Sequence, residues 1–183
     1  MPGCVPRLSR IEILDHREAD GVQSYRETFD EAYYCLNGAG DVEIVLRRTL
    51  PSTETTGPDV TQVVHVRTVW KSIPGSTVAE RTQINGTVSY AIVYGRTGAA
   101  FEGAGSVFCK QNRQKDVLRG TLEQAVLKPT RRLGEGSDLF HRAELAGEFR
   151  AVHNPRRVRR IVNEMNLLLG PLPKYVPGDL GPR

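Results

Sequence analysis

Four arginines near the C-terminal end of the chain have the clearest chemical meaning in the sequence. They lie within five consecutive positions after the pair Asn154-Pro155: Arg156, Arg157, Arg159 and Arg160. Asparagine is a favoured N-cap and proline a favoured first helical residue, so the pair predicts a helix start. Positive charge there opposes the helix dipole, whose positive end lies at the same place. The cluster therefore indicates an external anion, such as a phosphate group.

The cluster belongs to a half of the chain that is basic as a whole. Residues 1–105 contain 10 Lys and Arg against 13 Asp and Glu, whereas residues 106–183 contain 15 against 8. A nucleic acid presents closely spaced phosphates, and each cation that neutralises one releases a counterion. We therefore predict a non-enzymatic nucleic-acid-binding protein whose basic C-terminal half holds the phosphate backbone. The predicted binding residues are Lys110, Arg113, Lys115, Arg119, Arg131, Arg132, Arg156, Arg157, Arg159 and Arg160.

Two other functions are compatible with the same residues. The arginines and the backbone amides after Asn154 could hold a small phosphorylated ligand such as a nucleotide. The protein could also be an assembly subunit of a viral particle or ribonucleoprotein, which leaves a homo-oligomer open. A structural alternative exists for the arginine cluster itself, because Glu144 and Glu148 on a preceding element could pair with it. In that case the cluster would bind no external anion.

An enzyme is the less favoured class. Cys109 is the strongest candidate nucleophile, since it is predicted to end a strand close to a helix start, where a thiol pKa can fall. A nucleophile also needs a base, and nothing in the sequence places His65 or His141 beside it. Free cysteines are commonly buried, so we interpret Cys109 as a packed thiol. The mixed segment 15–20 lacks the spacing of a metal loop. We predict no catalytic residue, no metal site and no cofactor.

The cysteines and the N-terminus indicate a compartment. Cys4, Cys35 and Cys109 are an odd number without disulfide or zinc spacing, which favours reduced thiols. The first seven residues lack the apolar stretch of a signal peptide, and no window approaches the roughly 18 apolar residues of a membrane span. The sequence therefore predicts a soluble, cytoplasmic or otherwise intracellular protein that does not bind membranes.

The N-terminal half is predicted to contain one helix and then strands. Ser24 and Glu27 have the spacing of a capping box, and apolar residues follow at helical intervals, which predicts a helix over 24–36. Residues rich in β-branched side chains predict strands at 42–50, 61–72, 88–94 and 105–109. The glycine-rich segment 95–105 is predicted to be a flexible hairpin connection. An exposed sheet face could add Arg67, Lys71 and Tyr90 or Tyr94 to a nucleic-acid surface.

From Gln111 onward the apolar spacing changes to that of helices. Val117, Leu118, Thr121, Leu122, Ala125 and Val126 form one stripe, which predicts a basic amphipathic helix ending before Pro129. A second helix is predicted to begin at Ser137 or Asp138 and to include Val152. A third is predicted over 154–170, with Gly170 at its end.

This order of elements predicts an α+β protein. The expected fold is an antiparallel sheet of about four strands, preceded by one helix and followed by three helices packed on one face. A chain of 183 residues is long enough to bury a core without disulfides. We expect residues 1–170 to form a single domain and residues 171–183, rich in Pro and Gly, to be an extended or disordered tail.

Overall fold

The computed structural model describes residues 8–17, 21–37, 41–52, 57–68, 84–112, 116–134 and 142–170. Within these residues the chain forms nine strands and one helix. In chain order they are β1 (Ser9–Arg17), β2 (Gly21–Phe29), β3 (Glu31–Leu36), β4 (Val42–Leu50), β5 (Val60–Thr68), β6 (Gly86–Tyr94), β7 (Thr97–Asn112), β8 (Val117–Leu133), β9 (Ala143–His153) and α1 (Pro155–Leu169).

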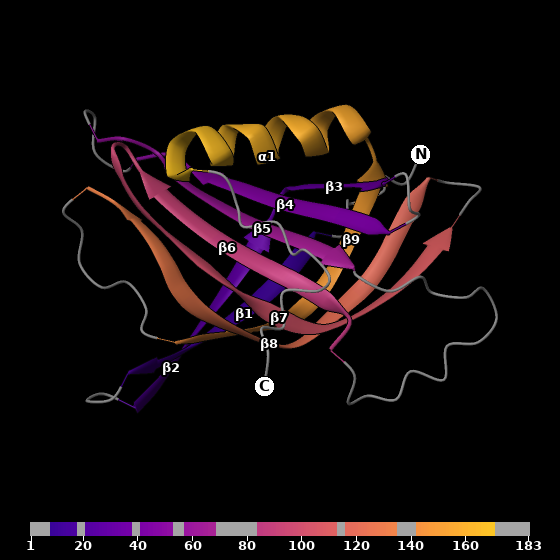
Figure 1. The fold of residues 1–183 in the computed structure, drawn as a ribbon, viewed down its shortest axis with the longest axis horizontal. Helices are drawn as coiled ribbons and strands as arrows, with labels where there is room; N and C mark the ends of the chain where they lie inside the picture. Colours follow the sequence, from indigo (N-terminus) through magenta and orange to yellow (C-terminus); the bar gives the residue numbers. More distant parts are fainter. Residues whose placement is uncertain are drawn as a thin grey trace, which may run out of the picture.

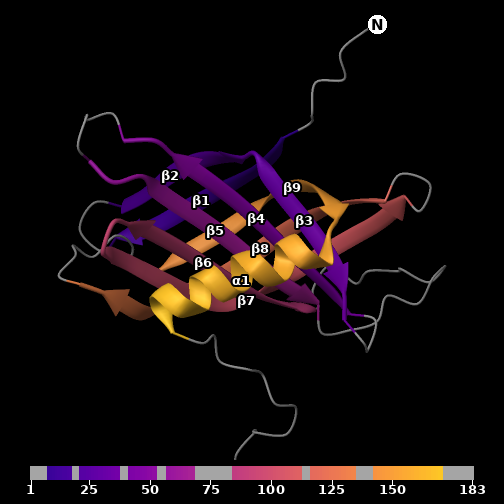
Figure 2. The same cartoon turned by 90° about the horizontal axis from the view of Figure 1, so that it is seen from above.

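The nine strands form one sheet, in which β3 to β9 close into a ring and β1 and β2 extend from β9. Their order is β2-β1-β9-β3-β4-β5-β6-β7-β8, and β8 also pairs with β9. All pairings are antiparallel except a short parallel one, in which Tyr33 and Tyr34 of β3 lie opposite Val152 and His153 of β9. Figure 1 shows β3, β4, β5 and β6 beneath α1, with β7 and β8 farther from the helix. We call β3, β4, β5 and β6 the upper layer, and β7 and β8 together with β9, which pairs with β8, the lower layer. The view from above in Figure 2 shows α1 lying across the strands.

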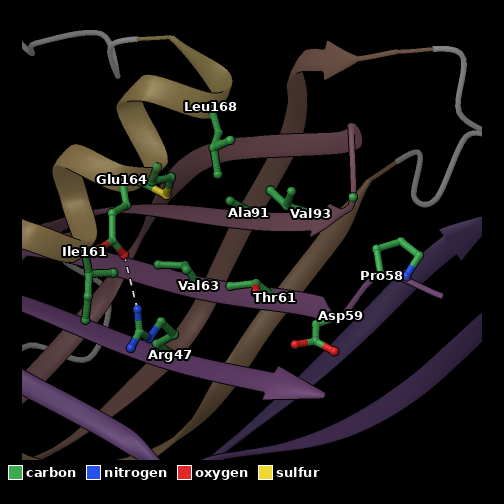
Figure 3. Close-up of a pocket in the computed structure, with 12 residues that line it drawn as sticks. Arg47, Pro58, Asp59, Thr61, Val63, Ala91, Val93, Ile161, Glu164 and Leu168 are labelled. Carbon is green, nitrogen blue, oxygen red and sulfur yellow. Dashed lines mark hydrogen bonds and ion pairs between the residues drawn. The ribbon is translucent and has the colours of Figure 1, made fainter. Parts of the chain in front are cut away.

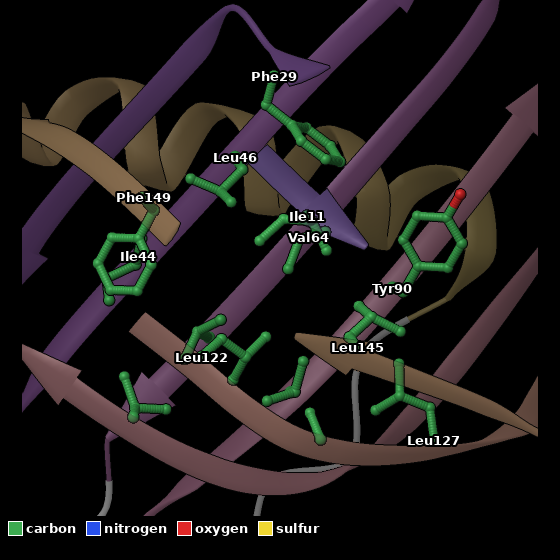
Figure 4. Close-up of a cluster of buried hydrophobic side chains, with 14 of the residues drawn as sticks. Ile11, Phe29, Ile44, Leu46, Val64, Tyr90, Leu122, Leu127, Leu145 and Phe149 are labelled. Atoms are coloured by element: carbon green, nitrogen blue, oxygen red, sulfur yellow. The ribbon is translucent and has the colours of Figure 1, made fainter. Parts of the chain in front are cut away.

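The main core fills the space between the two layers. Alternate residues of each strand face inward, as the two-residue period of a strand requires. The largest of these side chains are fully buried and come from both layers, as Figure 4 shows: Ile11, Phe29, Ile44, Leu46, Tyr90, Leu122, Leu127 and Leu145. The faces of β7, β8 and β9 that point away from this core are therefore left for the solvent or for a ligand.

A second, smaller core joins α1 to the outer face of the upper layer. Val158, Ile161 and Met165 of the helix are buried against Cys35, Val45, Val63 and Ala91 of β3, β4, β5 and β6. Their spacing of three and four residues places them on one face of the helix. The helix predicted after Asn154 is thus confirmed, with the Asn154 side chain accepting a hydrogen bond from the Arg157 N–H at 3.1 Å and Gly170 after its last residue.

The predicted α+β architecture is wrong, because the described chain is mostly β. The expected helix over 24–36 is β2 followed by β3, and Ser24, its expected N-cap, lies inside β2. Tyr25 and Phe29 are four residues apart, a spacing that keeps side chains on one face of a helix and also, being even, on one face of a strand. The pattern therefore could not distinguish the two, and the capping-box match was accidental.

The basic amphipathic helix predicted from Gln111 is also wrong. Its stripe lies in β8, where Leu118, Leu122, Ala125 and Leu127 are buried. The pairing of β8 with β9 shifts register between Leu122 and Ala125, and Gln124 there has a φ of 49°. The extra residue in the bulge changes which positions face the core. The buried side chains Leu118, Leu122 and Ala125 are therefore four and then three residues apart. A bulged strand therefore imitated the period of a helix.

Of the other predicted elements, the strands are found and a further helix is not. The expected strands at 42–50, 61–72, 88–94 and 105–109 correspond to β4, β5, β6 and part of β7, except that residues 69–72 lie outside the described residues. The helix expected to include Val152 is instead β9, and the glycine-rich segment expected as a loop is a turn at Gly95-Arg96 followed by β7. The expected tail over 171–183 and the residues from 135 to 141 lie outside the described residues.

Candidate anion-binding site

Three basic residues lie side by side on the outer face of the lower layer. Lys110 of β7 is directly opposite Arg119 of β8, and Arg119 is directly opposite Arg150 of β9. Opposite residues of antiparallel strands share a face. The neighbouring side chains Leu118 and Phe149 are buried in the core, so these three cations point outward. We call Lys110, Arg119 and Arg150 the basic row.

The charges of the basic row are not neutralised within the described structure. Lys110 and Arg119 are exposed and Arg150 is half-buried. None of the three side chains forms an ion pair with a described residue. Like charges placed directly opposite each other across strands are destabilising. The arrangement therefore favours an anion that binds all three together.

The basic row borders a depression in the sheet surface of about 370 Å³. Its other lining residues come from the same strands and from the residue before β1: Leu8, Phe108, Gly120, Thr121, Glu148 and Phe149. A Cβ added to Gly120 would lie 2.5 Å from the Phe149 ring and 2.3 Å from the Phe108 carbonyl oxygen. Glycine at position 120 therefore lets the Phe149 ring pack directly against the strand that forms the floor.

The depression is positively charged overall. Among the described residues that line it, Glu148 is the one carboxylate, against the three cations of the basic row. It lies opposite Thr121 on β8 and opposite Arg10 on β1. A tetrahedral or planar oxyanion could accept hydrogen bonds from the two guanidinium groups and the ammonium group. The chemistry that the site offers is thus binding of an anion, with Thr121 and Glu148 beside it for polar groups of the same ligand.

The predicted binding residues are only partly brought together. Lys110 and Arg119 meet in the basic row, whereas Arg131 and Arg132 lie at the other end of β8. Arg150 was missed, because the sequence pattern placed it on a helix and not opposite Arg119. Arg113, Lys115 and Lys71 lie outside the described residues. The fully buried Tyr90 belongs to the core, so it cannot stack a base.

Arg131 has a structural role. Its Nη1 donates to the carbonyl oxygen of Leu169 at 3.2 Å and to that of Gly170, and its Nη2 lies 3.5 Å from Glu102 Oε1. Carbonyl oxygens at a helix end carry the negative end of its dipole. Arg131 therefore fastens the last turn of α1 to the sheet, and its positive charge faces the carbonyl oxygens at the helix end and the Glu102 carboxylate.

The α1 arginines project from the upper layer. Arg156, Arg159 and Arg160 are exposed, and Arg157 is half-buried. Arg160 Nε donates to Glu164 Oε1 at 2.7 Å, one helical turn away. The alternative pairing is not observed, because Glu144 lies 3.3 Å from His16 and 3.2 Å from Arg142, and Glu148 lines the depression. The predicted basic residues between 110 and 132 thus lie on β7 and β8, whereas those between 156 and 160 lie on α1.

A second concave region lies between α1 and the upper layer (Figure 3), with a volume of about 410 Å³. Its floor and helix wall are mainly apolar and include Val63, Ala91, Ile161 and Leu168. The cation at its edge, Arg47, pairs with Glu31 and also with Glu164, the latter at 3.2 Å. Arg47 is thus held by two carboxylates, so the described lining of this groove offers no unpaired cation to a phosphate.

One arrangement of potentially catalytic residues was not predicted. Glu43 lies between the Cys35 thiol, at 3.7 Å from Oε2, and His65 Nε2, at 2.8 Å from Oε1. Burial and the Glu43 carboxylate raise the pKa of Cys35 to about 11. Cys35 is 6% exposed and His65 4%. A nucleophile needs a lowered pKa and access to substrate, so these three residues form a structural cluster.

Cys109 has the properties of a packed thiol. It lies against the main core, and burial raises its pKa to about 12. His65 faces Glu43 on the outer side of the upper layer, and His141 lies outside the described residues. Among the described residues, no group of three or more His, Cys, Asp or Glu side chains is arranged to hold a metal ion.

Comparison with models of protein families, with curated proteins and with solved structures gives no match. The comparisons therefore support no particular function, and nucleic-acid and nucleotide binding gain nothing from them. The described part of the chain contains no helix with the length and apolarity needed to cross a membrane. The described residues define a mostly β structure, with a closed ring of strands, one helix on its outer face and a basic row on the opposite layer.

Proposed function

We propose that the protein is a non-enzymatic binder of a phosphate-bearing ligand, which it holds at the basic row. The observation that carries the proposal is the direct opposition of Lys110, Arg119 and Arg150 on three adjacent strands. Strands lie about 4.8 Å apart, so three cations in a line span roughly 10 Å. A single phosphate group would contact all three cations only if their long side chains converged on one point. A ligand with two or more phosphates, or a chain of them, fits it better.

Both nucleic acid and a free nucleotide supply this chemistry. A strand of nucleic acid carries phosphates in series and needs only an open, basic surface. A nucleotide needs a concave pocket, and the depression lies within the volume range of about 300–1,000 Å³ typical of small-ligand sites. Phe108, half-buried beside the basic row, offers an aromatic surface to a base in either case. The shared feature is the phosphate group, and the ligand is identified by the experiment below.

Fluorescence anisotropy with a labelled single-stranded oligonucleotide tests the proposal. Three phosphate contacts predict that the logarithm of the affinity falls with the logarithm of salt concentration with a slope of about −2, measured between about 50 and 200 mM salt. Unlabelled nucleoside triphosphate is then added as a competitor. Displacement at concentrations near those of competing oligonucleotide identifies a nucleotide site, and weak displacement identifies a strand site. Absence of binding by both probes at the lowest salt would contradict the proposal.

The proposed setting of this activity is intracellular. Cys35 and Cys109 are both free cysteines. Reduced thiols are the usual state inside cells, where disulfides are rare. This location is compatible with a phosphate-bearing ligand, and an antibody or fluorescent fusion used in the source cells would test it.

A further inference from the structure

β2 is the one strand of the described sheet that leaves a whole edge unpaired. Every other strand has partners on both sides, whereas β2 pairs with β1 alone. All nine residues of β2, Gly21–Phe29, pair with β1 in one register without a bulge. Proteins commonly protect such edges with proline, lysine, a bulge or a very short strand. β2 has no proline, lysine or bulge and is nine residues long, and its charged residues are Arg26 and Glu27.

The side chains of β2 already have partners within their own sheet. Ser24 Oγ donates to Glu12 Oε1 at 2.7 Å, and Arg26 Nε lies 3.4 Å from the same oxygen. On the other face the Tyr25 hydroxyl donates to Gln23 at 2.6 Å, and Glu27 pairs with Arg48. The groups that this edge offers to a partner are therefore its backbone N–H and C=O groups. A second β-strand is the structure that satisfies such a row.

We infer that β2 pairs antiparallel with β2 of a second copy of this chain, around a two-fold axis at Tyr25. This register places Arg26 opposite the partner subunit's Ser24 and Gln23 opposite the partner subunit's Glu27, so no like charges meet. It also places Val22, which is 59% exposed, opposite the partner subunit's Thr28. An axis at Arg26 would instead oppose two guanidinium groups, which is destabilising. A two-fold interface of this kind uses the same surface on both copies.

The inference does not depend on the proposed ligand, but it has a consequence for that ligand. Pairing of the two edges joins the lower layers of both copies into one continuous sheet. The two basic rows would then lie on the same face of that sheet. A long polyanion could contact both rows, and the second contact would be intramolecular, which raises the overall affinity.

Light scattering after size-exclusion chromatography, repeated over a wide range of protein concentration, tests the inference. The wild type is expected to change from monomer to dimer as concentration rises. Ser24→Lys places an ammonium group opposite the partner subunit's Arg26 at two symmetric positions, and we expect dimerisation to weaken by about tenfold. The matched variant Ser24→Lys with Arg26→Ser exchanges the positions of the cation and the hydroxyl, so the new ammonium group faces a hydroxyl of the partner subunit and no like charges meet, within the chain or across the interface. This variant should restore the dimer. Thermal unfolding of each variant confirms that it folds.

Two results would overturn the inference. A wild type that stays monomeric at every concentration would show that the edge is not used for self-association. A dimer that Ser24→Lys leaves unchanged would show that the copies meet elsewhere. Weakening by Ser24→Lys without rescue by the double variant would contradict the register centred on Tyr25.

Discussion

At the scale of single residues, the surroundings of a charged side chain decide what it contributes. Arg131 donates hydrogen bonds to the end of α1, and Arg47 forms ion pairs with two glutamates. Arg119 forms no ion pair with a described residue. The carboxylates differ in the same way. The hydrogen bond with His65 holds the pKa of Glu43 below its ordinary value of 4.5, whereas burial raises the pKa of Glu102.

Glu43 should therefore contribute to stability in a pH-dependent way. A carboxyl whose pKa is lower in the folded state stabilises the fold while ionised, and this contribution is lost as pH falls from about 4.5 through the folded-state pKa. Glu43→Gln should lower the free energy of unfolding at neutral pH and flatten its decline in acid, both measured by urea unfolding across pH. Glu102→Gln is the control, because burial raises the pKa of Glu102 and its ionisation therefore does not stabilise the fold. An equally steep acid decline in Glu43→Gln would count against this assignment.

At the scale of elements, local signals could be predicted from the sequence and long-range pairing could not. α1 was predictable because its start and end signals are local in the sequence: Asn154 and Pro155 stand at its first turn and Gly170 follows its last residue. β8 was not, because its bulge at Leu122–Ala125 exists only through pairing with β9 and gives the inward side chains a helix-like spacing. The candidate site shows the same division. Lys110 and Arg119 were predicted from charge, whereas Arg150 joins them only through strand register.

The contact between α1 and β8 can be tested at this scale. Arg131→Ala removes the hydrogen bonds to the Leu169 and Gly170 carbonyl oxygens and leaves the partly buried Glu102 without its cation. Hydrogen bonds that involve a charged group contribute about 1.5–3 kcal/mol, so we expect about 2 kcal/mol of lost stability in urea unfolding. Arg131→Lys keeps the charge without the forked geometry and should lose less. Stability of Arg131→Ala equal to that of the wild type would show that α1 does not need this anchor.

At the scale of the whole molecule, a basic half of the sequence does not become one basic surface. The long strand β8 carries cations at both ends, with Arg119 near one end and Arg131 and Arg132 near the other. Arg119 and Arg131 are twelve residues apart on β8, which corresponds to roughly 40 Å along a strand. The α1 arginines project from the upper layer, beyond the second core. The net charge of +7 in residues 106–183 is thus divided among several places, and on the described strands the basic row is where cations without an ion pair lie directly opposite one another.

The central claim, that phosphate groups bind at the basic row, is tested most directly by the oligonucleotide affinity of Arg119→Gln. The matched control is Arg156→Gln with Arg159→Gln on α1, which removes more charge. We expect Arg119→Gln to weaken binding by about tenfold and to reduce the salt slope by about 1. Its melting temperature should stay the same or rise, because a like-charge contact is relieved. Undiminished binding by Arg119→Gln, with weakened binding by the α1 variant, would contradict the claim.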